Sequence, residues 1–250
     1  MIVASRQNWT SRVLERGRLG IAPDEKWKLV AYEQYKAKLR APDYPCFFGQ
    51  AGEERGEMLY TFIADGGLEE LVTNMRQFVS LIGTPGYERS SLVAFFEPDA
   101  GVADHASFVA RFWQILQFLH DDCDPPIDRT PDHPLWEFSF RGSEMFVVGA
   151  SPTYQRRRSR NLGPGIVLVF QPRSLFVDPA TSLPIAASVR HRIHQRMLAY
   201  DGISVHPDIG FYGDPTNREW KQYALPDDNE QEHGTCPFQA RIDGMFLTGH

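Results

Sequence analysis

Apolar residues recur along the chain with a helical period in some stretches and as short continuous or alternating runs in others. The helical period predicts four helices, over residues 24–40, Leu68–Ile82, Ala106–His120 and Ile185–Tyr200. The short apolar runs predict strands at 57–65, Ser91–Phe96 and Gly165–Phe170. The segment LWEFSFRGSEMFVVGAS predicts a β-hairpin that turns near Arg141–Ser143.

Helices mixed with a hairpin indicate an α+β fold, because a strictly parallel α/β fold would alternate its strands and helices regularly. We expect a mixed sheet with a β-hairpin, packed against several amphipathic helices. The sequence shows no repeat and no low-complexity linker, which predicts a single domain over residues 1–250. Residues 24–200 form its expected core. Residues 201–250, rich in Gly, Pro and aromatic residues, are expected to pack irregularly on that core.

Composition narrows the class of protein. The chain of 250 residues is 42% hydrophobic and has a net charge of -6, which argues against a general nucleic-acid or membrane surface. No apolar run approaches the roughly 20 residues that span a bilayer. The three cysteines lack metal-ligand spacing and are an odd number, so a disulfide framework is not expected. We expect a cytoplasmic protein.

One short stretch is strongly basic, although the chain as a whole has a negative net charge. The sequence SPTYQRRRSR gathers Arg156, Arg157, Arg158 and Arg160 within five positions. Guanidinium groups suit carboxylate and phosphate partners, so this arginine run predicts a site for a small anion. A solvated, charged turn is the alternative interpretation. The predicted helix at Ile185–Tyr200 is also basic, and we interpret it as a basic or anion-facing element.

Candidate catalytic chemistry is sparse, since the common nucleotide, esterase and zincin motifs are absent. Cys46, in a turn-rich segment between a helix and a strand, is either a thiolate ligand or nucleophile, or a small buried hydrophobe. Cys236 is a weaker candidate of the same kind. His120 ends an apolar helical face beside Asp121, so it is either a metal ligand or a histidine that interacts with the helix dipole.

Five segments together resemble the YqcI/YcgG family through their order and spacing over roughly residues 44–228. They are YPCFFGQAGEERGEMLYTFI, WQILQFLHDDCDPP, DHPLWEFSFRGSEMFVVGASPTYQRRRSR, VLVFQPRSLFV and HPDIGFYGDPTNREWKQYALPDD. That family includes heme proteins of natural-product pathways, among them the arginine N-hydroxylase of D-cycloserine biosynthesis and a similar enzyme of guanitoxin biosynthesis. The resemblance implies a heme-dependent oxygenase that hydroxylates a nitrogen of an amino acid, guanidine or amine.

The same resemblance implies heme b as cofactor and an external reductant. Cys46 is the favoured iron ligand, because a thiolate promotes O–O cleavage, and His120 is the alternative. If Cys46 binds iron, His120 and Asp121 become candidates for proton donation. The expected cofactor-binding residues are Cys46, His120, Tyr154, Arg156, Arg158, Arg160 and Arg173. The sequence CFFG at Cys46 stands where many members of the family carry Cys-Pro-Phe, and the motif Cys-Pro-Phe occurs instead at Cys236. The choice of iron ligand among Cys46, His120 and Cys236 therefore stays open.

The expected partners are a small amine or amino acid substrate, dioxygen and an electron-transfer partner, without nucleic acid or membrane, and a homodimer is left open. Two other functions compete with the oxygenase. One is a non-catalytic heme- or anion-binding protein, and the other is a non-heme metalloenzyme. The second needs histidines other than His105 and His120, because fifteen helical residues separate those two by about 22 Å.

Overall fold

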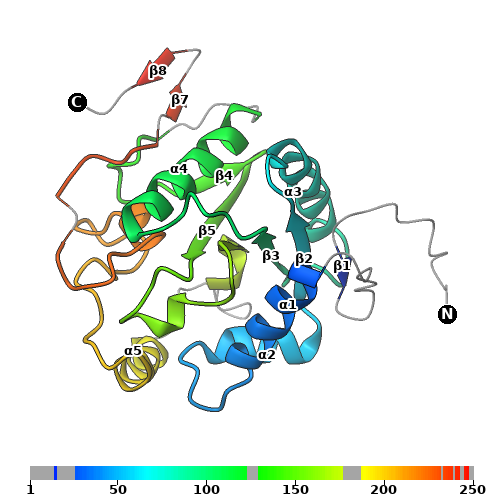
Figure 1. Cartoon of the computed structure of the whole chain (residues 1–250). Coiled ribbons are helices and arrows are strands. Elements are labelled where there is room, and N and C mark those ends of the chain that lie inside the picture. Colours follow the sequence, from blue (N-terminus) through cyan, green and yellow to red (C-terminus); the bar gives the residue numbers. More distant parts are fainter. Residues whose placement is uncertain are drawn as a thin grey trace.

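The computed structural model (Figure 1) describes residues 14–15, 26–122, 129–176, 187–231, 233–238, 240–242 and 245–247. Its longer helices are α1 (Lys26–Leu39), α2 (Phe47–Arg55), α3 (Leu68–Ile82), α4 (His105–Asp121) and α5 (Ala187–Asp201). Its strands are β1 (Leu14–Glu15), β2 (Met58–Ile63), β3 (Ser91–Phe96), β4 (Phe138–Phe140), β5 (Ser143–Ala150), β6 (Val167–Pro172), β7 (Ala240–Ile242) and β8 (Met245–Leu247). The described residues also include three short 3-10 helices, η2 (Arg158–Arg160), η3 (Arg173–Phe176) and η4 (Glu219–Gln222).

Six strands form one mixed sheet in the order β1-β2-β3-β6-β5-β4. Only the β2–β3 pair within it is parallel, and α3 connects these two strands. The β4–β5 hairpin pairs Phe140 with Ser143, as the sequence predicted. The α+β prediction, with a mixed sheet, a hairpin and helices packed against it, is confirmed.

Side chains on the two faces of the sheet belong to two separate cores, because successive strand residues point to opposite faces. One core joins α3 and α4 to alternate residues of the strands, such as Leu92 and Leu168, and also includes Trp220, Tyr223 and Phe238 from the C-terminal region. The other core joins α1 to the remaining strand residues, such as Val93 and Val169. Trp220, Tyr223 and Phe238 thereby attach the C-terminal region to the core that α3 and α4 form.

The segment that the sequence predicted to be turn-rich contains α2. Cys46 is its N-cap, since the Sγ atom accepts a hydrogen bond from the backbone N–H of Gly49. The helix ends at Gly56, whose φ of 74° is a left-handed conformation that favours glycine. Repeated glycines and a weak apolar period hide this helix from pattern analysis, so the expectation of an irregular segment was wrong.

Candidate functional site

A cavity of about 330 Å³ opens beside the sheet, between α2 and α5. Side chains of β5 and β6, such as Val148 and Gln171, line it from the sheet, on the face opposite to α3 and α4. Its volume lies within the usual range of small-molecule and cofactor sites, about 300–1,000 Å³. The apolar side chains of its wall are Phe48, Met58, Phe146, Val148, Leu175, Phe176, Ile193, Met197, Ile209 and Phe211.

Helix α5 presents one side to this cavity. Arg190, Ile193, His194 and Met197 line it at the i, i+3, i+4, i+7 spacing of a single helical face. The interpretation of this helix as an anion-facing basic element is consistent with Arg190 in the wall. Burial, followed by the neighbouring charges of His191 and Arg190, lowers the pKa of His194.

Cys46 lines the same cavity from the start of α2. Burial raises the pKa of the Cys46 thiol, and the backbone N–H groups of Gly49 and Phe48 and the charge of Arg196 oppose that shift. A bound metal ion would complete the deprotonation of a thiol in this position. Cys46 is thus a soft donor atom at a helix N-terminus, in the wall of a cavity.

The structure brings three of the predicted cofactor-binding residues to this cavity, namely Cys46, Arg160 and Arg173. Arg160 donates to the carbonyl oxygens of Gly149 and Tyr223 at 3.1 and 2.8 Å and to that of Gln222 at 2.9 Å. These bonds fix its guanidinium at the junction of β5 and η4.

The other residues of the arginine run form hydrogen bonds within the protein. Asp227 accepts hydrogen bonds from the backbone N–H groups of Gln155, Arg156 and Arg157, so its carboxylate fills the place predicted for an external anion. The buried side chain of Arg157 donates to the carbonyl oxygen of Pro226 at 2.7 Å and also bonds to residues 228 and 229.

Arg158 is likewise held by the chain, because it donates to the carbonyl oxygen of Tyr200 and lies 5.0 Å from the centre of that ring. Asp201 accepts from the N–H and hydroxyl of Ser159 at 2.8 and 2.7 Å. The run therefore fastens the C-terminal end of α5, and Arg156 and Arg158 do not line the cavity. If a cofactor occupies this cavity, Arg156 and Arg158 are not in its wall, so the expectation that they bind it stays a prediction that the cavity does not support.

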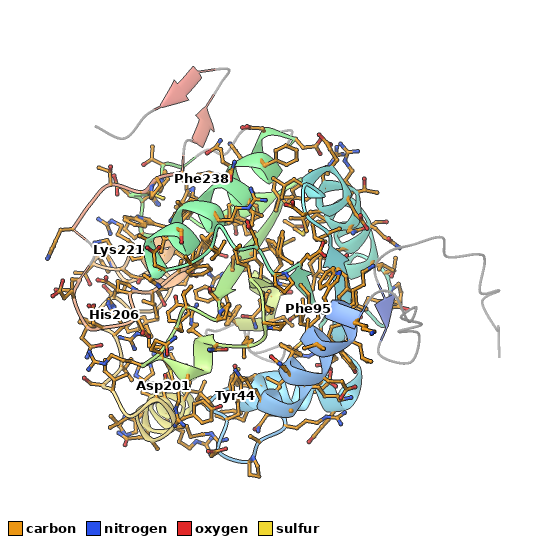
Figure 2. All side chains as sticks on the ribbon, in the orientation of Figure 1. Tyr44, Phe95, Asp201, His206, Lys221 and Phe238 are labelled. Carbon is orange, nitrogen blue, oxygen red and sulfur yellow. The ribbon has the colours of Figure 1, made fainter. Side chains whose placement is uncertain are left out.

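His120, Asp121 and Tyr154 do not line the cavity either. His120 is buried in the core under α4, and its ring lies 4.8 Å from that of Phe238. Figure 2 shows Phe238 beside α4, far from Tyr44 at the α1–α2 end of the molecule. The sheet separates His120 from Cys46 because α4 covers the opposite face.

Asp121 is exposed at the end of α4, where it accepts from Gln117 at 3.0 Å. The Tyr154 hydroxyl donates to the carbonyl oxygen of Leu225 at 2.7 Å within the α4 core. Cys236 is buried in that same core, and its burial raises the pKa of the thiol. Of the two cysteines within the described ranges, Cys46 alone lines the cavity.

Sequence reasoning missed a charged cluster at the wall. Arg173 forms ion pairs with the buried carboxylates of Glu137 and Glu219, the latter at 2.8 Å. Its guanidinium lies 4.0 Å from the centre of the Tyr212 ring. Burial raises the pKa of both carboxyl groups, that of Glu137 to about 8, while the charge of Arg173 opposes the shift. Besides Arg173, which the resemblance named, the segment HPDIGFYGDPTNREW, dense in Gly, Pro and aromatic residues, is of the kind that often lines a site.

Two further observations bear on the alternatives. Across the described ranges, no group of three or more His, Cys, Asp or Glu side chains could hold a metal ion, so the non-heme metalloenzyme finds no ligand set there. No helix of the described part is long and apolar enough to cross a bilayer.

Comparisons with known proteins match most of the chain. The model of the YqcI/YcgG family matches residues 35–239. The proteins "Uncharacterized protein YqcI" and "Uncharacterized protein YcgG" of Bacillus subtilis (strain 168) are 31% and 33% identical to the chain. Each alignment covers 88% of this chain, and 90% and 91% of the relatives, respectively.

A third relative has a functional name, "Putative N(omega)-hydroxy-L-arginine synthase DcsA" of Streptomyces lavendulae. It is 31% identical over 226 residues, which cover 86% of this chain and 85% of that protein. No solved structure matches the chain. With a family model that spans most of the described core and relatives aligned over nearly their full length, this chain belongs to the YqcI/YcgG family.

Proposed function

We propose that this protein is a heme-dependent N-oxygenase, which hydroxylates a nitrogen of an amino acid, guanidine or amine with dioxygen. The observation that carries the proposal is the position of Cys46, a soft donor atom at the N-terminus of α2 in the wall of a largely apolar cavity. The functional name of the relative from Streptomyces lavendulae supports N-hydroxylation as the reaction.

The residues of the cavity fit heme b in three respects. Cys46 would offer a thiolate ligand to the iron, and aromatic and aliphatic side chains from α2, β5 and α5 would form the apolar walls. Arg89 and Arg190 line the same cavity and would pair with carboxylate groups of the cofactor. Arg160 is held by backbone carbonyls, so its charge would act on such a carboxylate from a fixed position.

A thiolate-bound heme supplies activation of dioxygen when it is present. The overall reaction inserts one oxygen atom into an N–H bond and reduces the second atom to water, which consumes two electrons and two protons. The chain has no G-x-G-x-x-G motif for a nicotinamide or flavin dinucleotide, so we assign the electrons to an external reductant.

Side chains in the wall of the cavity would position a bound substrate and limit its contact with water. Burial lowers the pKa of His194, so the neutral ring is favoured and offers a nitrogen atom that can accept a hydrogen bond in the wall. Phe48 and Phe211 are 40% and 49% exposed and line the cavity, so they would shield a bound substrate from water only in part.

The first test is an absorption spectrum of the protein expressed with a heme precursor, recorded in the ferric state and after reduction under CO. We expect a red-shifted, thiolate-type Soret band that is lost in Cys46→Ser and retained in the control Cys236→Ser. A histidine-type band in the wild type, or an unchanged spectrum in Cys46→Ser, would overturn the assignment of Cys46.

The second test is turnover, with a chemical reductant, dioxygen and a panel of guanidines, amino acids and amines, followed by mass spectrometry. The expected product is heavier than its substrate by one oxygen atom, and that atom comes from labelled dioxygen. Heme binding without any such product would favour the non-catalytic heme-binding protein.

A further inference from the structure

The cluster of Glu137, Arg173 and Glu219 holds one more carboxylate than guanidinium at the wall of the cavity. Glu137 and Glu219 are each 2% exposed, and both contact the single guanidinium of Arg173. Arg173 and Glu219 line the cavity themselves, and Glu137 contacts Arg173 from the residue before β4. The formal charge of the three side chains is therefore -1.

An unmatched buried carboxylate is unfavourable, because neither water nor a counter-ion compensates its charge. Two events can remove the imbalance: a carboxyl group takes up a proton, or a cation enters the cavity. We propose that the Glu137–Arg173–Glu219 cluster is the part of the site that recognises a positively charged ligand, and that such a ligand releases one proton from the cluster as it binds.

The groups that surround Glu137 support this reading. Besides Arg173 and Glu219, the side chain of Glu144 on β5 acts on it, and Glu144 in turn pairs with Arg129 at 3.3 Å. Tyr212 and Tyr223 also feel the charge of Glu137, and burial raises the pKa of both phenols, so they stay neutral. Arg173 is thus the main cation acting on the two buried carboxyl groups.

The proton that the ligand would displace is bound to the carboxyl group of Glu137. Burial raises the pKa of Glu137 to about 8, so this carboxyl group is largely protonated at neutral pH. A ligand cation beside Glu219 favours the ionised form of Glu137, and the proton leaves. Glu219 is the residue placed to touch the ligand, since it lines the cavity, whereas Glu137 acts through Arg173 as a positioning residue.

This inference rests on the proposed function only for the kind of ligand, a guanidine or amine. A suitable probe is L-arginine, with L-citrulline as a control that has nearly the same shape but no side-chain charge. Isothermal titration calorimetry of the full chain, in buffers of different ionisation enthalpy, measures both the affinity and the number of protons released.

We expect L-arginine to bind with release of close to one proton at pH 7 and L-citrulline to bind at least tenfold more weakly. Because a proton leaves, the affinity for L-arginine should rise toward tenfold per pH unit between pH 6 and 7 and level off above about pH 8. Glu219→Gln should weaken the binding of L-arginine at least tenfold without a comparable effect on L-citrulline.

Glu137→Gln separates a positioning role from a merely structural one. The amide resembles the protonated carboxyl group, so the variant should bind L-arginine like the wild type at pH 6, at least tenfold more weakly at pH 8, and without proton release. Glu144→Gln is the matched control, because it removes a neighbouring exposed carboxylate that does not contact Arg173, and it should keep the proton release. Circular dichroism verifies that each variant is folded.

Equal affinity for L-arginine and L-citrulline, binding of L-arginine without proton release, or no binding of L-arginine would each overturn the inference. None of these results would affect the heme spectrum or the turnover of an uncharged amine, which test the proposed function. Conversely, a protein without a Soret band that still binds L-arginine with proton release would contradict the proposed function and leave this inference standing.

Discussion

Burial determines the partners and the ionisation of several charged side chains in this protein. Glu137 is the strongest case, since its carboxyl group is enclosed with one guanidinium that it shares with Glu219. Arg157 is another, because its buried guanidinium donates hydrogen bonds to oxygen atoms of residues 226, 228 and 229. Residue type alone indicated neither environment.

Glu137→Gln should change how stability depends on pH. The pKa of Glu137 is raised from 4.5 to about 8 in the folded protein, so its ionisation opposes folding, and this cost grows as the pH rises from about 5 to 8. In that window the variant should gain stability over the wild type by up to about 1.4 kcal/mol per pH unit. Urea denaturation at pH 5, 6, 7 and 8 measures the difference, and a difference that stays constant over this range would contradict the raised pKa.

Arg157→Ala should destabilise the protein by about 3 kcal/mol, because it removes a buried side chain that donates to partly buried oxygen atoms of residues 226, 228 and 229. Arg156→Ala is the matched control, since its side chain is exposed, and its change in stability should stay within about 0.5 kcal/mol. Thermal and urea denaturation compare the two. Equal stability of the two variants would show that the arginine run is a solvated turn.

Among the elements, α4 and β5 approach each other more closely than their patterns indicate. A Cβ atom built on Gly149 of β5 would lie 2.9 Å from ring atoms of Phe112 and 3.1 Å from one of Phe108. Close packing at a glycine of this kind places the aromatic residues of α4 directly on the sheet. It also brings the backbone of Gly149 within hydrogen-bonding distance of Arg160 and Tyr223.

Gly149→Ala should therefore cost about 1–3 kcal/mol of stability, because the rings of α4 have to shift. Gly163→Ala is a suitable control, since the nearest atom to its added Cβ lies at 3.6 Å. Chemical denaturation of both variants tests this contact between helix and sheet. A Gly149→Ala protein as stable as the Gly163→Ala control would contradict the close packing.

At the scale of the whole molecule, the one mixed sheet (Figure 1) supports both cores and one wall of the cavity. Neighbouring residues of a single strand, such as Leu92 and Val93, belong to different cores. Neither core can unfold without disrupting strands that the other needs. The single domain predicted from the sequence should therefore unfold in one cooperative transition.

Unfolding in urea, followed by tryptophan fluorescence and by far-ultraviolet circular dichroism, tests that expectation. Fluorescence reports mainly on one face of the sheet, because Trp113, Trp136 and Trp220 all lie in the α4 core. Circular dichroism reports on all helices and strands. Coincident transitions would agree with a single domain. Two separated transitions would show that the helices around the cavity form a unit of their own.

The sequence alone determined the α+β class, α3 and β3 with their limits, and the hairpin, because these depend on local periodicity and turn residues. It also singled out Cys46 and, through the resemblance, Arg173. It could not show that α2 begins at Cys46, since a helix with a weak apolar period depends on its caps and its neighbours. The tertiary structure decided which candidates meet. Cys46, Arg173 and Glu219 are far apart in sequence but line one cavity. The arginine run, in contrast, is bound to Asp227, and His120 lies in the core on the opposite face. Strand order and the two faces of the sheet place these residues, and neither can be deduced from local sequence.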